Sequence, residues 1–355
     1  MIRVAILVEQ NWNTVPGGTA RSINRLVEEL QQDSSLELVG VHGRHSTEPV
    51  LAVPTGLVTA EVPVPGKVLT QVWNRMDRPR LERWTGPIDV VHAPAYLVPG
   101  TTNPVAVTVH DLAFRHNPDW FTPHGVRYFD RFLQRLAAAD HRVIVPSSRT
   151  AGDCAEHGID PGRIDVIPWG SESIDVTDQQ IADALERHGV HDDAVLFVGT
   201  IEPRKNLEGL LAAMRLLPER QLVLVGPSGW GTTDLGDALV LGSLERTEVA
   251  ALMAGCGVVA YPSHFEGFGL PVLEAMAQGT PVVVTEGTVP EELAADGGVA
   301  VDTTNPPALA DAIEQLLSDP PYRARVGALG RQRAAEFDWA TTAARTADVY
   351  LKLGA

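Results

Sequence analysis

Short apolar runs alternate with segments of helical periodicity along the whole chain. Residues 3–8 form the first apolar run, which ends at Glu9, and residues 20–30 place Ile23, Leu26 and Val27 at helical spacing. A short apolar run followed by an amphipathic segment is typical of a parallel strand and its crossover helix. The pattern therefore predicts an α/β protein.

The pattern occurs in two series. The first predicts strands at 3–8, 36–41, 57–62, 88–92, 105–109, 141–146 and 163–168, and helices at 20–30, 122–139 and 147–157. The second predicts strands at 194–199, 221–226, 239–242, 257–261, 281–285 and 299–302, and helices at 205–217, 245–254, 271–277, 307–317, 322–336 and 339–353. Two series of this kind predict two Rossmann-like domains with parallel sheets. We expect them at 1–170 and 193–336, with a linker at 171–192 and a final helical segment at 337–355.

The composition agrees with a globular chain of two domains. The chain has 355 residues, of which 44% are hydrophobic and 21% are charged, and both fractions are usual for globular proteins. The two cysteines, Cys154 and Cys256, have no partner spacing, which favours a reducing, cytoplasmic location. No apolar run approaches the ~18 residues that a membrane span needs.

The net charge of −17 argues against nucleic acid as a partner, but it is unevenly distributed. Residues 1–170 carry −2, and residues 171–355 carry −15. The first half could therefore meet an anionic surface without strong repulsion. In the segment 66–84, basic residues alternate with Trp73, Met76, Leu81 and Trp84. This segment is either a half-buried element with a solvated face or a peripheral contact with an anionic membrane.

The segment 261–279 holds the densest candidate chemistry. A buried strand precedes it, a glycine-containing loop carries Glu266, and Pro271 opens a helix that carries Glu274 in its expected first turn. Free N–H groups at a helix start favour anions, and carboxylates hydrogen-bond hydroxyl groups. The set predicts a ligand rich in hydroxyls and phosphate. The alternative is a helix start that merely carries glutamates.

Two other polar sets follow predicted strands. Arg204 and Lys205 come after the strand at 194–199, in the acidic half, where they would neutralise a diphosphate; the alternative is a pair of surface charges beside Glu202. His110 and Asp111 follow the strand at 105–109, where His110 could also be purely structural. Gly17 and Gly18 fall in a loop after the first strand. Ligands of doubly wound sheets lie at such carboxyl ends.

Several motifs are absent from the sequence. It has no Asp-x-Asp and no Cys/His cluster with metal-ligand spacing, so we expect no metal. It also has no Gly-x-Gly-x-x-Gly after the first strand, no Gly-x-Ser-x-Gly and no nucleotide triphosphate loop.

The spacing of Glu266 and Glu274, with Gly-Phe-Gly-Leu-Pro between them, resembles the E-x7-E signature of the retaining GT-B glycosyltransferases of family four, which include bacterial mannosyltransferases and sucrose synthase. The tracts at 108–112, 197–206, 225–230, 273–281 and 337–339 resemble the same family in order and spacing. The resemblance covers nearly the whole chain and is weakest at 40–90 and 171–192.

The resemblance implies two domains that face each other across a cleft, a C-terminal helix that crosses back to the first domain, and a nucleotide sugar on the second domain. Glu274 would hold the ribose, and Arg204 with Lys205 the diphosphate. Glu266 would hold the sugar hydroxyls. The remaining implied contacts are the donor loop of Gly267, Phe268, Gly269 and Leu270, His110 on the transferred sugar, and Gly17 and Gly18 near the phosphate or acceptor.

The resemblance is strongest to the mannosyltransferase branch, which suggests transfer from GDP-mannose to a glycan or lipid-linked acceptor, without a metal and by front-face attack. Three alternatives remain at this point. They are a transferase that uses a UDP-sugar, a nucleotide-sugar epimerase, and a non-catalytic protein that binds sugar nucleotides.

Overall fold

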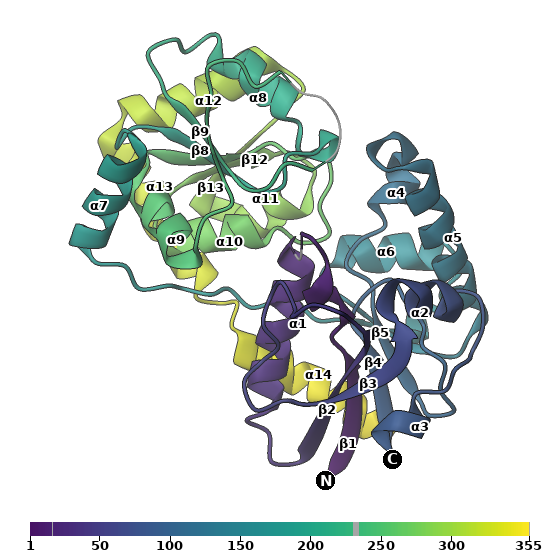
Figure 1. Ribbon diagram of the computed structural model, residues 1–355. Coiled ribbons are helices and arrows are strands. Elements are labelled where there is room, and N and C mark those ends of the chain that lie inside the picture. Colours follow the sequence, from purple (N-terminus) through teal and green to yellow (C-terminus); the bar gives the residue numbers. More distant parts are fainter. Residues whose placement is uncertain (16, 230–233, 355) are drawn as a thin grey trace. The chain divides into compact units, whose positions relative to one another are not determined.

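The computed structural model describes residues 1–15, 17–229 and 234–354 (Figure 1). Pro16 of the expected glycine loop and Trp230 of the tract at 225–230 lie outside these residues. The chain divides into two compact units. Unit 1 comprises Met1–Gly170 and Trp339–Ala355, and unit 2 comprises Ser171–Asp338.

Unit 1 is built on a seven-stranded parallel sheet in the order β3-β2-β1-β4-β5-β6-β7. Its strands are β1 (Ile2–Leu7), β2 (Leu36–Arg44), β3 (Val58–Pro65), β4 (Val90–Ala93), β5 (Val105–Thr108), β6 (Arg142–Val145) and β7 (Ile164–Val166). The strand order reverses between β1 and β4. In doubly wound sheets this switch point is where ligands bind.

Helices cover both faces of this sheet (Figure 1). They are α1 (Gly17–Leu30), α2 (Gly66–Trp73), α3 (Glu82–Thr85), α4 (Ala113–His116), α5 (Pro123–Ala138), α6 (Ser148–Glu156) and α14 (Trp339–Leu353). The C-terminal helix α14 packs beside α1 (Figure 1). Tyr350 of α14 also bonds to the sheet, because its hydroxyl lies 2.6 Å from Nδ1 of the buried His92 on β4.

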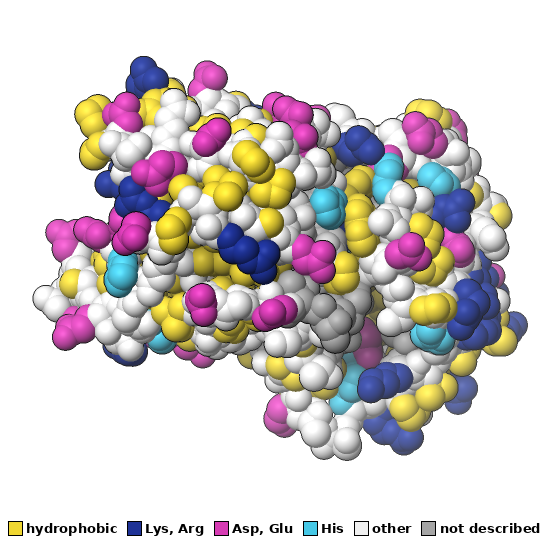
Figure 2. Space-filling view, turned by 90° about the horizontal axis from the view of Figure 1, so that it is seen from above, with side chains coloured by type: hydrophobic (Ala, Val, Ile, Leu, Met, Phe, Trp, Pro, Cys, Tyr) yellow, Lys and Arg dark blue, Asp and Glu magenta, His cyan; other side chains and the backbone are white. Residues whose placement is uncertain are grey.

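The segment 66–84 turns only some of its apolar side chains inward, since Val68 and Met76 are each 51% exposed. Leu69, Trp73 and Leu81 are buried in the core of unit 1, and the Trp73 indole N–H donates to the Pro79 carbonyl oxygen at 2.7 Å. The basic side chains that remain exposed are Lys67, Arg75, Arg78, Arg80 and Arg83. The segment is thus half-buried, and its exposed face carries the basic side chains. Figure 2 shows Lys and Arg side chains gathered on the side of unit 1 that carries α2 and α5.

Unit 2 repeats the architecture with a six-stranded parallel sheet in the order β10-β9-β8-β11-β12-β13. Its strands are β8 (Val195–Val198), β9 (Leu222–Val225), β10 (Leu239–Gly242), β11 (Val258–Tyr261), β12 (Val282–Thr285) and β13 (Gly298–Val301). The order reverses between β8 and β11, so the carboxyl ends of these neighbouring strands form the second switch point.

The helices of unit 2 are α7 (Asp178–His188), α8 (Leu207–Met214), α9 (Arg246–Gly255), α10 (Leu270–Ala277), α11 (Val289–Ala294), α12 (Pro306–Ser318) and α13 (Pro320–Ala334). The stretch expected as a linker with one helix contains α7, which begins at a capping box of Thr177 and Gln180 and packs against α9 of unit 2. Residues 171–192 therefore belong to unit 2. None of the helices among the described residues is long and apolar enough to cross a bilayer.

Candidate active site

The switch point of unit 2 holds a cluster of alternating charges, Glu202, Arg204, Glu266 and Lys205. Arg204 and Lys205 follow β8 on a 3-10 turn, Pro203–Lys205, and Glu266 lies on the loop after β11. The Lys205 ammonium donates to Glu266 Oε1 at 2.6 Å, and Arg204 Nη1 donates to Glu266 Oε2 at 3.3 Å. The cluster thus joins the two strand ends.

Burial makes the charges of this cluster interact strongly. The Lys205 and Glu266 side chains are each 8% exposed, and Arg204 is 16% exposed. Burial raises the pKa of Glu266, but the charges of Arg204 and Lys205 and the hydrogen bond from Lys205 outweigh it and lower that pKa to about 2. Glu266 is therefore a carboxylate at neutral pH. The alternative interpretation of Arg204 and Lys205 as surface charges is wrong.

Tyr261 and Asn206 hold Lys205 in place. The Lys205 ammonium donates to the Tyr261 hydroxyl at 2.7 Å and lies 4.7 Å from the centre of the Tyr261 ring. Asn206 adopts a left-handed conformation with φ of 53°, accepts a hydrogen bond from the N–H of Gly209, and donates to Thr303. These bonds fix the turn between Lys205 and α8. They explain why α8 begins at Leu207 and not at Lys205 as expected.

The donor loop leads directly into α10. Gly269 is the residue before the helix and has φ of 121°, a conformation that glycine adopts most easily. Phe268 is buried against Phe337. The first N–H groups of a helix such as α10 lack acceptors within the helix. The helix starts at Leu270, one residue before the expected Pro271. This start places Glu274 fifth in the helix, in the second turn and not in the expected first.

Glu274 takes part in a different ion pair. Its Oε1 lies 3.8 Å from Arg246 Nη2, and Arg246 also pairs with Glu172. The Glu274 side chain is 23% exposed, so it remains accessible to a ligand hydroxyl. The pairing partners Arg246 and Glu172 carry no motif that would have marked them in the sequence.

In unit 1, His110 follows β5 at the carboxyl edge of the sheet. Its Nε2 lies 2.8 Å from the carbonyl oxygen of Pro94, and its ring lies 5.6 Å from that of Trp169. Burial lowers the pKa of His110, so the ring is neutral at physiological pH. Since Nε2 then carries the proton that bonds Pro94, Nδ1 presents a lone pair that can accept a hydrogen bond.

Asp111 supports the start of α4, and Gly17 and Gly18 begin α1. Asp111 Oδ1 accepts hydrogen bonds from the N–H of Ala113, at the start of α4, and from the Tyr96 hydroxyl. Gly17 and Gly18 lie in the first turn of α1, not in the expected loop, and Gly17 has a left-handed φ of 62°. Both glycines still follow β1 at the switch point of unit 1.

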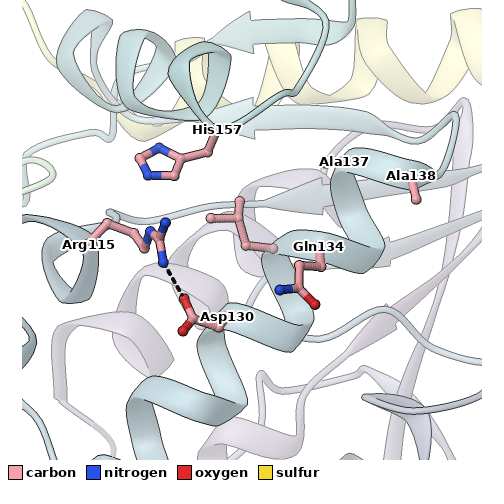
Figure 3. A pocket seen from close by; sticks show the side chains of 7 residues that line it. Arg115, Asp130, Gln134, Ala137, Ala138 and His157 are labelled. Atoms are coloured by element: carbon pink, nitrogen blue, oxygen red, sulfur yellow. Dashed lines mark hydrogen bonds and ion pairs between the residues drawn. The ribbon is translucent and has the colours of Figure 1, made fainter.

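Unit 1 also contains a pocket of about 440 Å³ between α4, α5 and α6 (Figure 3). It is lined by Arg115, Asp130, Leu133, Gln134, Ala137, Ala138 and His157. Arg115 and Asp130 form an ion pair at 2.8 Å across it. Because these two charges neutralise each other, the pocket gives no electrostatic reason to expect a phosphate there. Among the described residues, no group of His, Cys, Asp and Glu side chains is arranged to hold a metal ion.

Within unit 2, the structure brings together Arg204, Lys205 and Glu266, and it adds Glu202 and Tyr261. The sequence contained a signal for both additions. Glu202 lies two residues before Arg204, and Tyr261 is the last residue of the buried strand before the donor loop.

Comparison with known proteins places these features in a family. The family model described as glycosyl transferases group 1 matches residues 181–333, and the model described as Glycosyltransferase Family 4 matches residues 16–172. The MMP alpha-(1->4)-mannosyltransferase of Mycolicibacterium hassiacum is 31% identical over 75% of this chain and 71% of its own length. The chain belongs to the group 1 glycosyltransferases.

Two further comparisons extend this assignment. The glycosyltransferase is 28% identical to the O-antigen chain mannosyltransferase B of Escherichia coli, over 74% of each chain. Its fold matches the crystal structure of Anabaena Alr3699/HepE, in complex with UDP and glucose, with a TM-score of 0.75 over 98% of this chain and 99% of that one, at 19% identity. The predicted GT-B fold of two Rossmann-like parallel-sheet units is confirmed.

Proposed function

We propose that this glycosyltransferase retains the anomeric configuration and transfers mannose from GDP-mannose to a glycan or lipid-linked acceptor without a metal. The observation that carries the proposal is the buried cluster of Arg204, Lys205 and Glu266 at the switch point of unit 2. Two cations support a leaving diphosphate, and a carboxylate accepts hydrogen bonds from sugar hydroxyls. The two mannosyltransferase relatives support mannose as the sugar.

The cations act mainly on the leaving group. As the bond between C1 of the sugar and the phosphate oxygen breaks, negative charge builds on the diphosphate, and Arg204 and Lys205 stabilise it more than in the ground state. The acceptor oxygen attacks C1 from the same face, and its proton passes to the departing diphosphate. In unit 2, Glu266 and the N–H groups of the loop 267–270 hold the sugar, while Glu274 holds the ribose. In unit 1, the Nδ1 lone pair of His110 can accept a hydrogen bond from a hydroxyl group.

A test begins with ligand binding. We expect GDP and GDP-mannose to raise the melting temperature of the full chain more than UDP or ADP, because a ligand that binds only the native state stabilises it. Lys205→Met and Glu266→Gln should abolish the shift with GDP-mannose. Glu208→Gln is the matched control, because Glu208 is exposed on the neighbouring helix α8. No shift with any nucleotide would refute the donor site.

Transfer is tested with GDP-mannose and mannosyl oligosaccharides as acceptors. NMR of the product shows whether the new bond keeps the α configuration of the donor, and an inverted product would refute retention. Activity that is lost with EDTA and restored by Mg²⁺ would refute independence from metal. NMR of the donor incubated without acceptor would reveal an altered sugar if the protein were an epimerase.

The second candidate donor is a UDP-sugar. The observation in its favour is the fold match to a protein whose structure contains UDP and glucose. A larger melting-temperature shift with UDP-glucose than with GDP-mannose would favour this candidate. Both donors would use the same diphosphate cations.

We also propose that the enzyme acts in the cytoplasm and that unit 1 contacts anionic membranes through exposed basic residues of the segment 66–84. The support is the exposure of Arg75, Arg78, Arg80 and Arg83, together with the near-neutral charge of the first half of the chain. The buried Trp73 and Leu81 would take no part, so the contact would be electrostatic and sensitive to salt.

A further inference from the structure

The Arg204 guanidinium has an internal counter-ion, Glu202. Nε and Nη2 of Arg204 both donate to Oε1 of Glu202, at 3.1 and 2.9 Å. Glu202 is buried, with a side chain that is 6% exposed, so water screens this contact weakly. The same guanidinium edge would otherwise be available for the paired hydrogen bonds that arginine makes to phosphate.

The whole cluster is balanced in charge. Arg204 and Lys205 contribute two positive charges, while Glu202 and Glu266 contribute two negative charges within hydrogen-bonding distance of them. A small anion that approaches the two cations also meets the two carboxylates. A ligand with hydroxyl groups differs, because its hydroxyls can donate to Glu266 while its phosphates bind the cations.

We propose that Glu202 is a specificity-determining residue, which acts through Arg204 to make the site reject anions that lack sugar and nucleoside groups. Inorganic phosphate and pyrophosphate are the chemical class that it excludes. A nucleotide sugar overcomes the repulsion through its additional contacts with the loop 267–270 and Glu274. This inference rests on the proposed donor site. It assigns to Glu202 the discrimination against simple anions, which Arg204 and Lys205 alone would bind.

Local geometry supports a positioning role as well. Arg204 lies in the turn Pro203–Lys205 and makes two hydrogen bonds to the loop after β11. Its carbonyl oxygen accepts from the N–H of His264, and its guanidinium donates to the Phe265 carbonyl oxygen. Glu202, at the start of the same turn, bonds Nε and Nη2 of the guanidinium, whereas Nη1 bonds the Phe265 carbonyl and Glu266. A neutral residue with the shape of Glu202 would therefore leave the positive charge of Arg204 without this counter-ion. The hydrogen bonds that tie Arg204 to the loop after β11 would stay in place.

The test is Glu202→Gln in the full chain, because glutamine keeps the size of glutamate and an oxygen that accepts from Arg204. Affinities for pyrophosphate and for GDP are measured by titration calorimetry in EDTA. We expect pyrophosphate to bind at least about ten-fold more tightly than to the wild type, since one buried negative charge near the ligand is gone. The affinity for GDP should rise less, because its nucleoside contacts are unchanged. Glu202→Asp should restore most of the discrimination.

The sign of the change separates this role from a structural one. Damage to the fold weakens every ligand, whereas loss of discrimination strengthens pyrophosphate binding. Glu208→Gln, which removes an exposed charge from α8, should leave both affinities within about two-fold of the wild type, because water screens exposed charges. Unchanged or weaker pyrophosphate binding in Glu202→Gln would overturn the proposal. If the wild type binds no nucleotide, the donor site itself fails, which is a different result.

Discussion

Replacing Lys205 with methionine tests the buried cluster most directly. Methionine keeps the length of the side chain but removes the ammonium that bonds Glu266 Oε1 at 2.6 Å and the Tyr261 hydroxyl at 2.7 Å. The Glu266 carboxylate would then stay buried beside Arg204, whose Nη1 lies 3.3 Å from Glu266 Oε2. We expect a marked loss of stability, in addition to any loss of activity.

The magnitude follows from the pKa of Glu266. It falls from an ordinary value of 4.5 to about 2 against the opposing effect of burial. At ~1.4 kcal/mol per pH unit, this difference corresponds to about 3 kcal/mol in favour of the charged form. Removing one partner of a buried ion pair costs about 3–5 kcal/mol. Because Arg204 shares this effect with Lys205, we expect Lys205→Met to lower the free energy of unfolding of unit 2 by up to about 3 kcal/mol at neutral pH.

The assay is differential scanning calorimetry of Lys205→Met, Glu266→Gln and the double variant. In the double variant no carboxylate is left without its lysine, so its loss of stability should be clearly smaller than the sum of the two single losses. The effect also depends on pH. Because the folded pKa of Glu266 is depressed, its contribution is present above about pH 4.5 and is lost as the pH falls toward about 2. Additive losses, or the same loss at pH 3 and pH 7, would refute the reasoning.

Three other predictions concern separate parts of the chain. Tyr350→Phe should destabilise unit 1 by about 1–3 kcal/mol, measured by urea unfolding, because it leaves Nδ1 of the buried His92 without its partner; an unchanged midpoint would contradict this. Glu274→Gln should weaken GDP binding in calorimetry but leave pyrophosphate binding unaltered, and equal weakening of both would argue against the ribose contact. Neutralising Arg75, Arg78, Arg80 and Arg83 together should reduce co-sedimentation with anionic liposomes, and binding equal to that of the wild type would remove the membrane proposal.

The order of strands and helices was predictable because each unit repeats one physical pattern. Strands that are buried on both faces read as continuous apolar runs, and crossover helices keep their own periodicity. The short helix α11 (Val289–Ala294) was missed because six residues give too few turns to show that periodicity. The extent of unit 2 was missed for another reason, since the contact between α7 and α9 is tertiary.

The site was predictable only in part. Arg204, Lys205 and Glu266 stand at strand ends, and the topology explains why residues 62 positions apart touch. The hydrogen bond that Asp111 accepts from the N–H of Ala113 and the left-handed turn at Asn206 depend on backbone conformation, which a single sequence does not display. Glu202 and Tyr261 stand in the sequence near the other site residues. Their contacts with Arg204 and Lys205 are strong because both side chains are buried, and this burial results from tertiary packing.

The helix α14 has a consequence for how the chain is assembled. Because residues 339–355 belong to unit 1, unit 2 is inserted into unit 1 rather than appended to it. The exit and return points lie together, since the rings of Trp169 and Trp339 stack at 6.0 Å and the N–H of Ser171 bonds the Phe337 carbonyl. Unit 2 is therefore one continuous segment whose two ends are adjacent. With this arrangement, two cuts in the gene are enough to excise unit 2 or to exchange it between relatives.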